Sequence, residues 1–394
     1  MLPTNIDLEK SLGILYYATS SEGIGGSIRG FVEDFMVFED SDIPLDSRGS
    51  HLVLVIEKRN VTTDYVIRHI SKIFGIDRKL IGFAGIKDSR AVVLQKFSIP
   101  FGGEIEVEKL NVEGKIRVIE AYTSSRKIRL GMLRGNNFQI TLRNSNFRRE
   151  LIETVLYELD ASGCPNYFGY QRFGTHRYNT HLLGYHVLKE DYESFVEELV
   201  YKVYPNESSL AKNARTLARE GCLKDAYNIM PKSLWIEKRV LGLMLKNFPL
   251  NKIVRMLGRN LLKFYVNAYQ SYLFNLMLSE RICKGLPLNR CVEGDFVKGG
   301  EPAFPLIGYK SKFPSGESGK IVKNVIEGEN LALEMFRNKS LGLKVKGSLR
   351  KLRLNYKDFR YAINDSSVRF CFWLEKGCYA TTLLREFCKN EFYK

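Results

Sequence analysis

Apolar and polar residues alternate along several short stretches of the first 145 residues, and this period of two is typical of half-buried β-strands. One helix interrupts the pattern, because Thr62 is a capping residue that precedes the apolar run 65–70. The N-terminal part is therefore predicted to be rich in strands. The predicted strands are residues 27–38, 51–57, 95–100, 105–108, 116–119 and 137–142.

Beyond Arg148 the spacing changes, because apolar residues recur at the three- and four-residue intervals of helices. The predicted elements are helices at 151–160, over 180–260 and at 261–283, short strand-like pieces at 285–325, a strand at 368–374 and a helix at 381–390. The chain is thus strand-rich, then helical, then strand-rich. Insertion of one domain into another would explain this order.

The composition is that of a folded protein, with 44% hydrophobic and 26% charged residues. A length of 394 residues favours two domains. No apolar run approaches the length of a membrane span, and the first residues lack the pattern of a signal peptide. The seven cysteines form no CxxC motif and the five histidines have no metal-ligand spacing, so we expect a reduced, cytoplasmic protein without structural zinc.

A net charge of +16 suggests a polyanionic partner. Short basic clusters such as 126–129, 344–346 and 350–353 are interleaved with apolar residues, so they belong to folded elements. With 21 tyrosines and 24 phenylalanines, the chain also offers stacking surfaces for unpaired RNA bases. The alternative is a basic surface that only aids solubility, with the aromatic residues in the core.

Asp88 is the candidate for chemistry. It follows Lys87 in the segment Gly85-Ile86-Lys87-Asp88, and Arg90 lies two residues further on. Neighbouring cations favour the charged form of a carboxylate, and a partly shielded carboxylate can act as a nucleophile or a base. A surface turn with a merely paired aspartate is the alternative.

Three further segments carry candidate residues. Asn136 and Phe138 follow a turn-like Arg134-Gly135, where an amide could contact a base edge and a ring could stack; a hairpin turn with a core phenylalanine is the alternative. The segment 165–174 is dense in aromatic residues and could be a structural anchor or a ligand wall. Tyr379 would project at the turn before the last helix, in which Arg385 and Glu386 could form ion pairs. By contrast, Gly23-Ile24-Gly25-Gly26 is better explained as a turn than as a phosphate loop.

Taken together, these segments resemble the TruD-type tRNA pseudouridine synthases over almost the whole chain. The matching segments are, in order, Gly23–Glu39 with Val32-Glu33-Asp34-Phe35, Gly85–Asp88 with Ala91-Val92, Gly135–Phe138, Asn166–Gly174, Ala268–Asn275 and Tyr379–Glu386. The chain departs from the family pattern at Arg29, where lysine is usual, at Val32, where proline is usual, and at Glu375-Lys376. Arginine keeps the charge but changes its shape.

The resemblance implies an α/β (α+β) pseudouridine synthase fold with a mixed, mostly antiparallel central sheet, plus an inserted α/β TRUD domain. We predict the catalytic domain at residues 1–165 and 346–394 and the insert at 166–345, and helix 261–283 could pack with the catalytic domain. The implied activity is the isomerisation of one uridine in tRNA, typically uridine 13 in the D arm, to pseudouridine. No cofactor or metal is implied, and a monomer with tRNA as its partner and no membrane association is expected.

The resemblance also implies roles for individual residues. Asp88 would be catalytic, Arg29 or Lys87 would keep it charged, and a flipped-out base would have to reach it. The other predicted residues are Asn136, Phe138 and Tyr379 as uracil contacts, and Phe168, Gln171, Arg172 and Arg385 as RNA-binding or junction residues. A non-catalytic RNA-binding protein, such as an RNA chaperone, is the alternative; a metal-dependent nuclease lacks recognised paired carboxylates.

Overall fold

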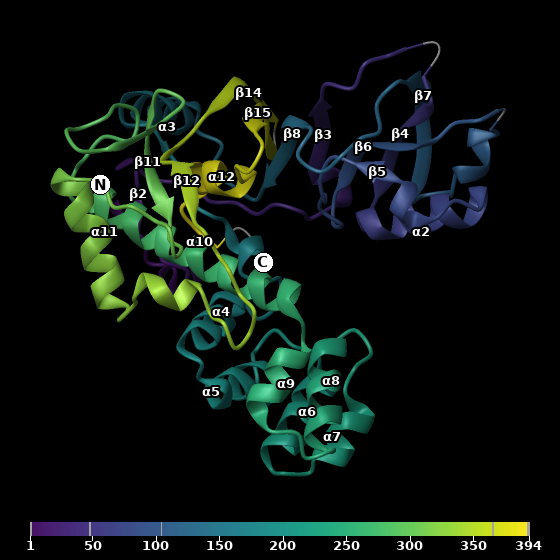
Figure 1. Cartoon of the computed structure of the whole chain (residues 1–394). Coiled ribbons are helices and arrows are strands. Elements are labelled where there is room, and N and C mark those ends of the chain that lie inside the picture. Colours follow the sequence, from purple (N-terminus) through teal and green to yellow (C-terminus); the bar gives the residue numbers. More distant parts are fainter. Residues whose placement is uncertain (1, 47–48, 104, 365, 392–394) are drawn as a thin grey trace. The chain divides into compact units, whose positions relative to one another are not determined.

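The computed structural model describes residues 2–46, 49–103, 105–364 and 366–391 (Figure 1). The chain forms two compact units: unit 1 comprises Met1–Ser20 and Ala161–Arg353, and unit 2 comprises Ser21–Asp160 and Leu354–Lys394. These bounds differ from the predicted domain bounds at residues 1–20, 161–165 and 346–353. The assignment of a catalytic and an inserted domain stays a prediction.

Unit 2 is built on an eight-stranded sheet with the strand order β14-β15-β8-β3-β6-β4-β7, and β5 pairs with β6 (Figure 1). Only β3 and β6 are parallel neighbours within this described sheet, and the other pairs are antiparallel. This mixed, mostly antiparallel sheet confirms the predicted fold class. The strands are β3 (Phe35–Ser41), β4 (His51–Arg59), β5 (Gly82–Phe83), β6 (Val92–Pro100), β7 (Ile116–Ser124), β8 (Leu133–Arg143), β14 (Tyr356–Asn364) and β15 (Ser367–Glu375).

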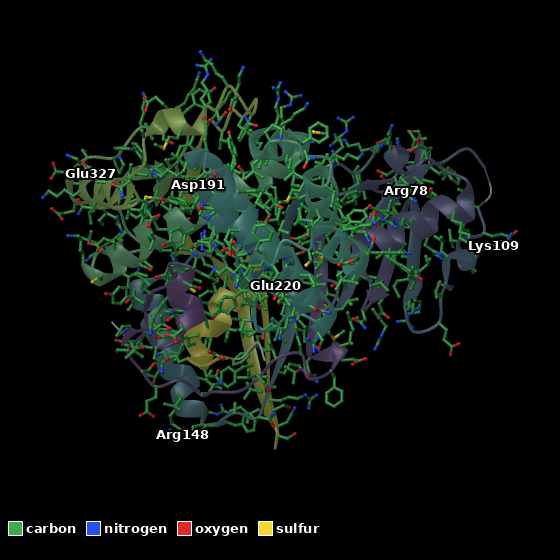
Figure 2. All side chains as sticks on the ribbon, turned by 90° about the horizontal axis from the view of Figure 1, so that it is seen from below. Arg78, Lys109, Arg148, Asp191, Glu220 and Glu327 are labelled. Carbon is green, nitrogen blue, oxygen red and sulfur yellow. The ribbon has the colours of Figure 1, made fainter. Side chains whose placement is uncertain are left out.

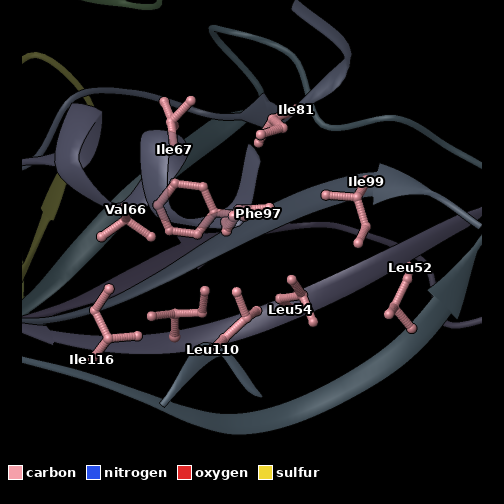
Figure 3. Packing of buried hydrophobic residues seen from close by; sticks show 11 residues of the cluster. Leu52, Leu54, Val66, Ile67, Ile81, Phe97, Ile99, Leu110 and Ile116 are labelled. Atoms are coloured by element: carbon pink, nitrogen blue, oxygen red, sulfur yellow. The ribbon is translucent and has the colours of Figure 1, made fainter. Parts of the chain in front are cut away.

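Helix α2 (Thr63–Phe74) covers one part of this sheet. Thr62 caps the helix, because its side chain accepts a hydrogen bond from the Tyr65 backbone N–H at 3.0 Å. Val66, Ile67 and Ile70 lie on one face of α2 and are buried against alternate residues of β4 and against Phe97 of β6 (Figure 3). Phe83 of β5 also packs against this core, so the core holds both strands that flank the loop carrying Asp88.

Helix α12 (Ala380–Cys388) is held in unit 2 by a cluster of aromatic rings. Phe387 of α12 lies 5.4 Å from Phe359 and 5.2 Å from Phe370, measured between ring centroids. Phe359 in turn stacks on Phe372, which stacks on Phe138 at 5.6 Å. The cluster therefore joins α12 to strands β14, β15 and β8. The other helical elements of unit 2 are η1 (Val32–Asp34), η2 (Arg78–Leu80), η3 (Val107–Leu110) and most of α3 (Arg149–Ser162).

Unit 1 is mainly helical around α10 (Arg259–Cys283), which has 25 residues. Helix α4 (Thr180–Lys189) approaches α10 at Gly184, where a Cβ atom would come within 2.2 Å of the Tyr265 carbonyl oxygen. Only glycine permits this distance. The other helices are α1 (Asp7–Ser11), α5 (Tyr192–Val196), a π-helix (Glu197–Tyr201), α6 (Ser209–Arg219), α7 (Leu223–Ile229), α8 (Trp235–Met244), α9 (Leu250–Met256), α11 (Gly316–Gly328), η4 (Tyr170–Arg172) and η6 (Leu333–Phe336).

Short strands complete the fold. They are β1 (Leu2–Pro3) with β2 (Tyr16–Tyr17), the three-stranded sheet of β10 (Phe296–Lys298), β11 (Glu301–Leu306) and β12 (Ser348–Lys351), and β9 (Cys164–Pro165) with β13 (Arg353–Leu354). Strand β14 and helix α11 were not predicted from the sequence pattern, while the predicted long helix matches α10 closely.

The predicted strand at 105–108 is wrong, and the one at 27–38 is confirmed only over residues 35–38. Residues 27–34 do not continue β3, because Arg29 has a φ of 64° and the turn η1 follows it. The Asp34 carboxylate closes this turn by accepting the Phe31 backbone N–H at 2.8 Å, and it ties the turn to β8 by accepting from Arg143 at 2.8–3.0 Å. Residues 105–108 include the start of η3, and the alternation of Ile105 and Val107 reflects packing against the core rather than sheet pairing.

Charged side chains lie on the surface of both units (Figure 2). Arg78 and Lys109 of unit 2 and Glu220 and Glu327 of unit 1 are exposed, and Lys109 and Glu327 lie at the outline of the view in Figure 2. None of the described helices has the length and apolar character needed to cross a membrane.

Candidate active site

Asp88 lies on the loop between β5 and β6, and this loop is held by buried polar side chains. The Gly85 carbonyl accepts a hydrogen bond from Gln95 Nε2 at 2.7 Å. The Lys87 backbone N–H donates to Thr63 Oγ1 at 3.1 Å, and Thr63 Oγ1 donates to Gln95 Oε1 at 3.2 Å. Residues of α2 and β6 thus fix the loop backbone immediately before Asp88.

Lys58 holds the Asp88 backbone itself. This lysine is fully buried, and its ammonium group donates to the Asp88 carbonyl and, at 2.9 Å, to the Val61 carbonyl. Burial lowers the pKa of Lys58 to about 8, although the charge of Asp88 opposes the shift. A buried ammonium group with two carbonyl partners restrains the position of Asp88.

Arg29 is the cation that contacts the Asp88 carboxylate. Arg29 Nη2 lies 3.3 Å from Asp88 Oδ1, and the two side chains are 15% and 27% exposed. The guanidinium group stacks over the Phe35 ring at 4.3 Å, and Phe35 meets Phe138 edge to face at 6.1 Å. The aromatic rings orient Arg29, while the exposed part of Asp88 remains accessible from outside.

Lys87 is directed to a different pair of side chains. Its Nζ lies 3.5 Å from Glu39 Oε2 and donates to Asn136 Oδ1. Glu39 and Asn136 are directly opposite each other on β3 and β8, so their side chains share one face of the sheet. Burial raises the pKa of Glu39 and lowers the pKa of Lys87, and the attraction between the two opposes both shifts.

The arrangement presents one partly accessible carboxylate, paired with a guanidinium group, on a rigid backbone. Such a group can attack an electrophilic carbon or remove a proton from a substrate that reaches it. Among the residues that the structure describes, no group of three or more His, Cys, Asp or Glu side chains is placed to hold a metal ion.

The two predicted stacking residues differ in exposure. Phe138 is 8% exposed and lies between Phe35 and Phe372, which favours a supporting role for its ring. Tyr379 is half-buried and immediately precedes α12, where its carbonyl accepts the Thr382 backbone N–H at 3.0 Å. The predicted turn at Arg134–Asn136 is wrong, because β8 begins at Leu133 and includes it.

The aromatic segment 165–174 lies in unit 1 and is anchored on α10. The Phe168 backbone N–H donates to Asn275 Oδ1 at 2.8 Å, and Asn275 Nδ2 donates back to the Phe168 carbonyl at 3.1 Å. Phe168 is 8% exposed, whereas Gln171 is exposed and Arg172 is half-buried. Phe168 is therefore a structural anchor of the segment. Gln171 and Arg172, by contrast, reach the surface.

Arg385 does not reach the surface. Its side chain is 2% exposed and lies 3.2 Å from Glu386 Oε1, measured from Nη1. Because the Arg385 side chain is buried, an RNA phosphate cannot reach it. Of its two predicted roles, RNA-binding residue and junction residue, only the second fits this position.

Sequence reasoning missed Lys58, Glu39, Thr63 and Gln95 as parts of the site. One signal for Lys58 was present, because Leu52, Leu54 and Ile56 lie on one buried face of β4 and Lys58 continues the same side of the strand. A lysine at an inward-facing strand position needs hydrogen-bond partners, and the Asp88 carbonyl provides one.

Comparison with solved structures gives the class of the protein. A crystal structure from Methanosarcina mazei, assigned to tRNA pseudouridine synthase D, superposes with a TM-score of 0.82 and 32% sequence identity, and the match covers 98% of each chain. The chain therefore has the fold of a pseudouridine synthase, which includes the mixed sheet of unit 2.

The chain belongs to the tRNA pseudouridine synthase D (TruD) family, whose family model matches residues 11–302 and 297–387. Relatives named probable tRNA pseudouridine synthase D support this. The protein from Pyrobaculum islandicum is 37% identical over 405 residues, with 97% of each chain covered. The protein from Methanococcoides burtonii is 36% identical over 435 residues, with 98% of each chain covered.

Proposed function

We propose that this protein isomerises uridine 13 of tRNA to pseudouridine and that Asp88 is its catalytic residue. Membership of the TruD family supports the reaction class. The observation that carries the assignment of Asp88 is its geometry: a partly accessible carboxylate, 3.3 Å from Arg29, on a loop that buried side chains hold.

The reaction breaks the N1–C1′ bond of uridine, turns the uracil and joins C5 to C1′. The proton on C5 is lost and N1 gains a proton, so the product is an isomer and no oxidant or cofactor is consumed. Asp88 would act as a nucleophile on the sugar or the base, or as the base that removes a sugar proton.

The target base must leave its stack to meet Asp88, which costs a few kcal/mol. Stacking on an aromatic ring returns about 1–3 kcal/mol per base. Tyr379 suits this role better than Phe138, because Tyr379 is the more exposed of the two. Asn136 remains a candidate for a contact to the uracil, although its Oδ1 already accepts from Lys87.

The Asp88→Asn variant tests the assignment. We expect it to bind tRNA but to release no tritium from 5-tritiated uridine in tRNA, with EDTA present, because an amide is neither a nucleophile nor a base of comparable strength. Asp64→Asn is the matched control, since Asp64 pairs with Arg68 on the exposed face of α2. Tritium release by Asp88→Asn at the rate of the control would contradict the role of Asp88.

The same assay separates the competing classes of function. A non-catalytic RNA-binding protein would release no tritium even with Asp88 present, and a nuclease would cut the RNA and stop when EDTA is added. Mapping of new pseudouridine in an undermodified set of tRNAs tests the target position. Modification at a position other than 13 would contradict that part of the proposal.

A further inference from the structure

Unit 1 contains a basic pocket of about 430 Å³ that the catalytic assignment does not use. Its walls come from α10, from the end of the aromatic segment and from the residues that lead into β12. All of its lining residues belong to unit 1, so the pocket does not depend on the placement of unit 2.

Four cationic side chains line the pocket, and no acidic side chain is among its described lining residues. They are Arg172, Lys263, Lys344 and Lys346. The three lysines are exposed and form no ion pair with any described acid, whereas lysines elsewhere in unit 1, such as Lys320 and Lys323, pair with glutamates. The unpaired lysines around one concave surface create a local field that attracts an anion.

The backbone that carries two of these lysines is held in place. Residues 342–346 alternate between exposed and buried, so Lys344 and Lys346 lie on the same exposed side. The Val345 N–H donates to the Phe336 carbonyl at 2.9 Å, and the Val345 carbonyl accepts the Tyr309 N–H at 3.0 Å. Both sides of Val345 are therefore fixed, and the two lysines are presented from an ordered segment.

Aromatic rings flank the cations. Arg172 Nε donates to Ser271 Oγ at 2.9 Å, which directs the guanidinium group along α10. Its Cζ lies 6.0 Å from the Phe168 ring and 5.8 Å from the Phe264 ring. Phe264 is 49% exposed, and an exposed ring beside the basic pocket is suited to base stacking.

We propose that this pocket binds the phosphate backbone of RNA, and that Phe264 stacks on a neighbouring unpaired base. A phosphodiester fits because it supplies repeated negative charge to several lysines, while the adjacent base supplies an aromatic face. The proposal rests on the proposed function only in taking RNA as the ligand. It adds a binding site built only from residues of unit 1, whereas the Asp88 loop belongs to unit 2.

The test measures tRNA affinity against salt concentration in an Asp88→Asn background, so no turnover is needed. A triple variant, Lys263→Gln with Lys344→Gln and Lys346→Gln, is compared with the charge-matched control Lys284→Gln with Lys320→Gln and Lys323→Gln. The control lysines are exposed residues of unit 1 that pair with glutamates outside the pocket. Thermal unfolding of each variant checks that the fold is kept.

We expect the pocket variant to lower the slope of log K against log salt by about 2 to 3, and the affinity at about 0.1 M salt by roughly a hundredfold. The control should change the slope by less than about 1. Phe264→Ala should weaken binding roughly five- to hundredfold with the salt slope unchanged, because stacking releases no counterions.

Equal affinity and slope for the pocket variant and the control would overturn the proposal. Calorimetry with inorganic phosphate is the second measurement. If the pocket variant loses phosphate binding but keeps its tRNA affinity, the pocket binds only free anions and the proposal is wrong. A failure of the proposed function would instead appear as tritium release by Asp88→Asn, or as no release by the unchanged protein, with these binding results unaffected.

Discussion

The pairing of Arg29 with Asp88 joins residues that lie 59 positions apart in the sequence. Arg29 adopts a φ of 64°, which is uncommon for a residue with a side chain. Its carbonyl lies 3.5 Å from Arg90 Nη2, and its guanidinium group lies over Phe35. We infer that this conformation is tolerated because it directs the guanidinium group to Asp88, in keeping with the clustering of strained residues at active sites.

Replacement of Arg29 tests this pairing. We expect Arg29→Met to lower the single-turnover rate of tritium release roughly ten- to hundredfold, because a hydrogen bond to a charged group contributes about 1.5–3 kcal/mol. Arg29→Lys should retain part of the rate, since it keeps the charge but not the planar geometry. The control is Arg78→Met, which changes an exposed arginine of unit 2. Equal rates for Arg29→Met and this control would exclude a role of Arg29 in supporting Asp88.

The buried side chain of Lys58 predicts that the stability of the protein depends on pH. Its pKa falls from the ordinary value of 10.5 to about 8 in the folded protein, because the charged form is buried. Between these two pH values the unfolded chain binds more protons than the folded chain, so the free energy of unfolding increases as the pH rises. The cost of the buried charge is thus fully present below pH 8 and is relieved towards pH 10.5.

We therefore expect the unfolding free energy of unit 2, relative to a Lys58→Met variant, to rise by about 3 kcal/mol between pH 8 and 10.5. The chain has two tryptophans, and Trp373 lies in unit 2. Urea unfolding followed by Trp373 fluorescence, in a Trp235→Phe background, measures this unit. A difference between the two proteins that is independent of pH would show that Lys58 is not the titrating group.

At the scale of elements, α2 and β6 position the aspartate loop through one shared hydroxyl group. Thr63, the first residue of α2, accepts from the Lys87 N–H and donates to Gln95, which itself holds the Gly85 carbonyl. Thr63 and Gln95 are both buried, so neither can be replaced by water without cost. The junction of helix, strand and loop therefore forms one connected hydrogen-bond network.

The variant Thr63→Val keeps the shape of the side chain but removes these hydrogen bonds. We expect a fall in kcat of about tenfold with little change in tRNA affinity, because unsatisfied buried groups cost about 1–3 kcal/mol and displace the loop. Thr62→Ala is the control, since it removes the α2 cap at a cost of about 1 kcal/mol without touching the loop. Similar kcat values for both variants would show that loss of helix stability, rather than loop position, determines the rate.

At the scale of the whole molecule, the net charge of +16 should make the affinity for RNA depend strongly on salt. We expect tRNA affinity of the Asp88→Asn protein to fall by about a thousandfold between about 50 and 200 mM salt, if six phosphates are contacted. Filter binding across this range measures the slope. Affinity that does not change with salt would mean that phosphate contacts contribute little, and would contradict the role assigned to the basic surface.

The element predictions succeeded where the chain repeats a local pattern. Alternation located most of β8, an apolar run rich in Leu, Val and Ile located β4, and three- and four-residue spacing located α10. The same alternation failed at residues 27–34, where a left-handed residue breaks the strand, and at 105–108, where apolar residues pack on the core without pairing. Strand β14 was missed although Phe359, Tyr361 and Ile363 alternate with exposed residues, and a register shift between Lys357 and Arg360 interrupts its pairing with β15.

The sequence by itself determined the mixed α/β character of the protein, its basic charge and, through ordered motifs that resemble one family, the position of the candidate aspartate. Only the tertiary structure decided that Arg29 rather than Lys87 contacts the Asp88 carboxylate at 3.3 Å. It also decided that Lys58 holds the Asp88 carbonyl and that Arg385 is buried. Local patterns record which face of an element is buried, whereas these contacts depend on strand register and on packing between residues far apart in the chain.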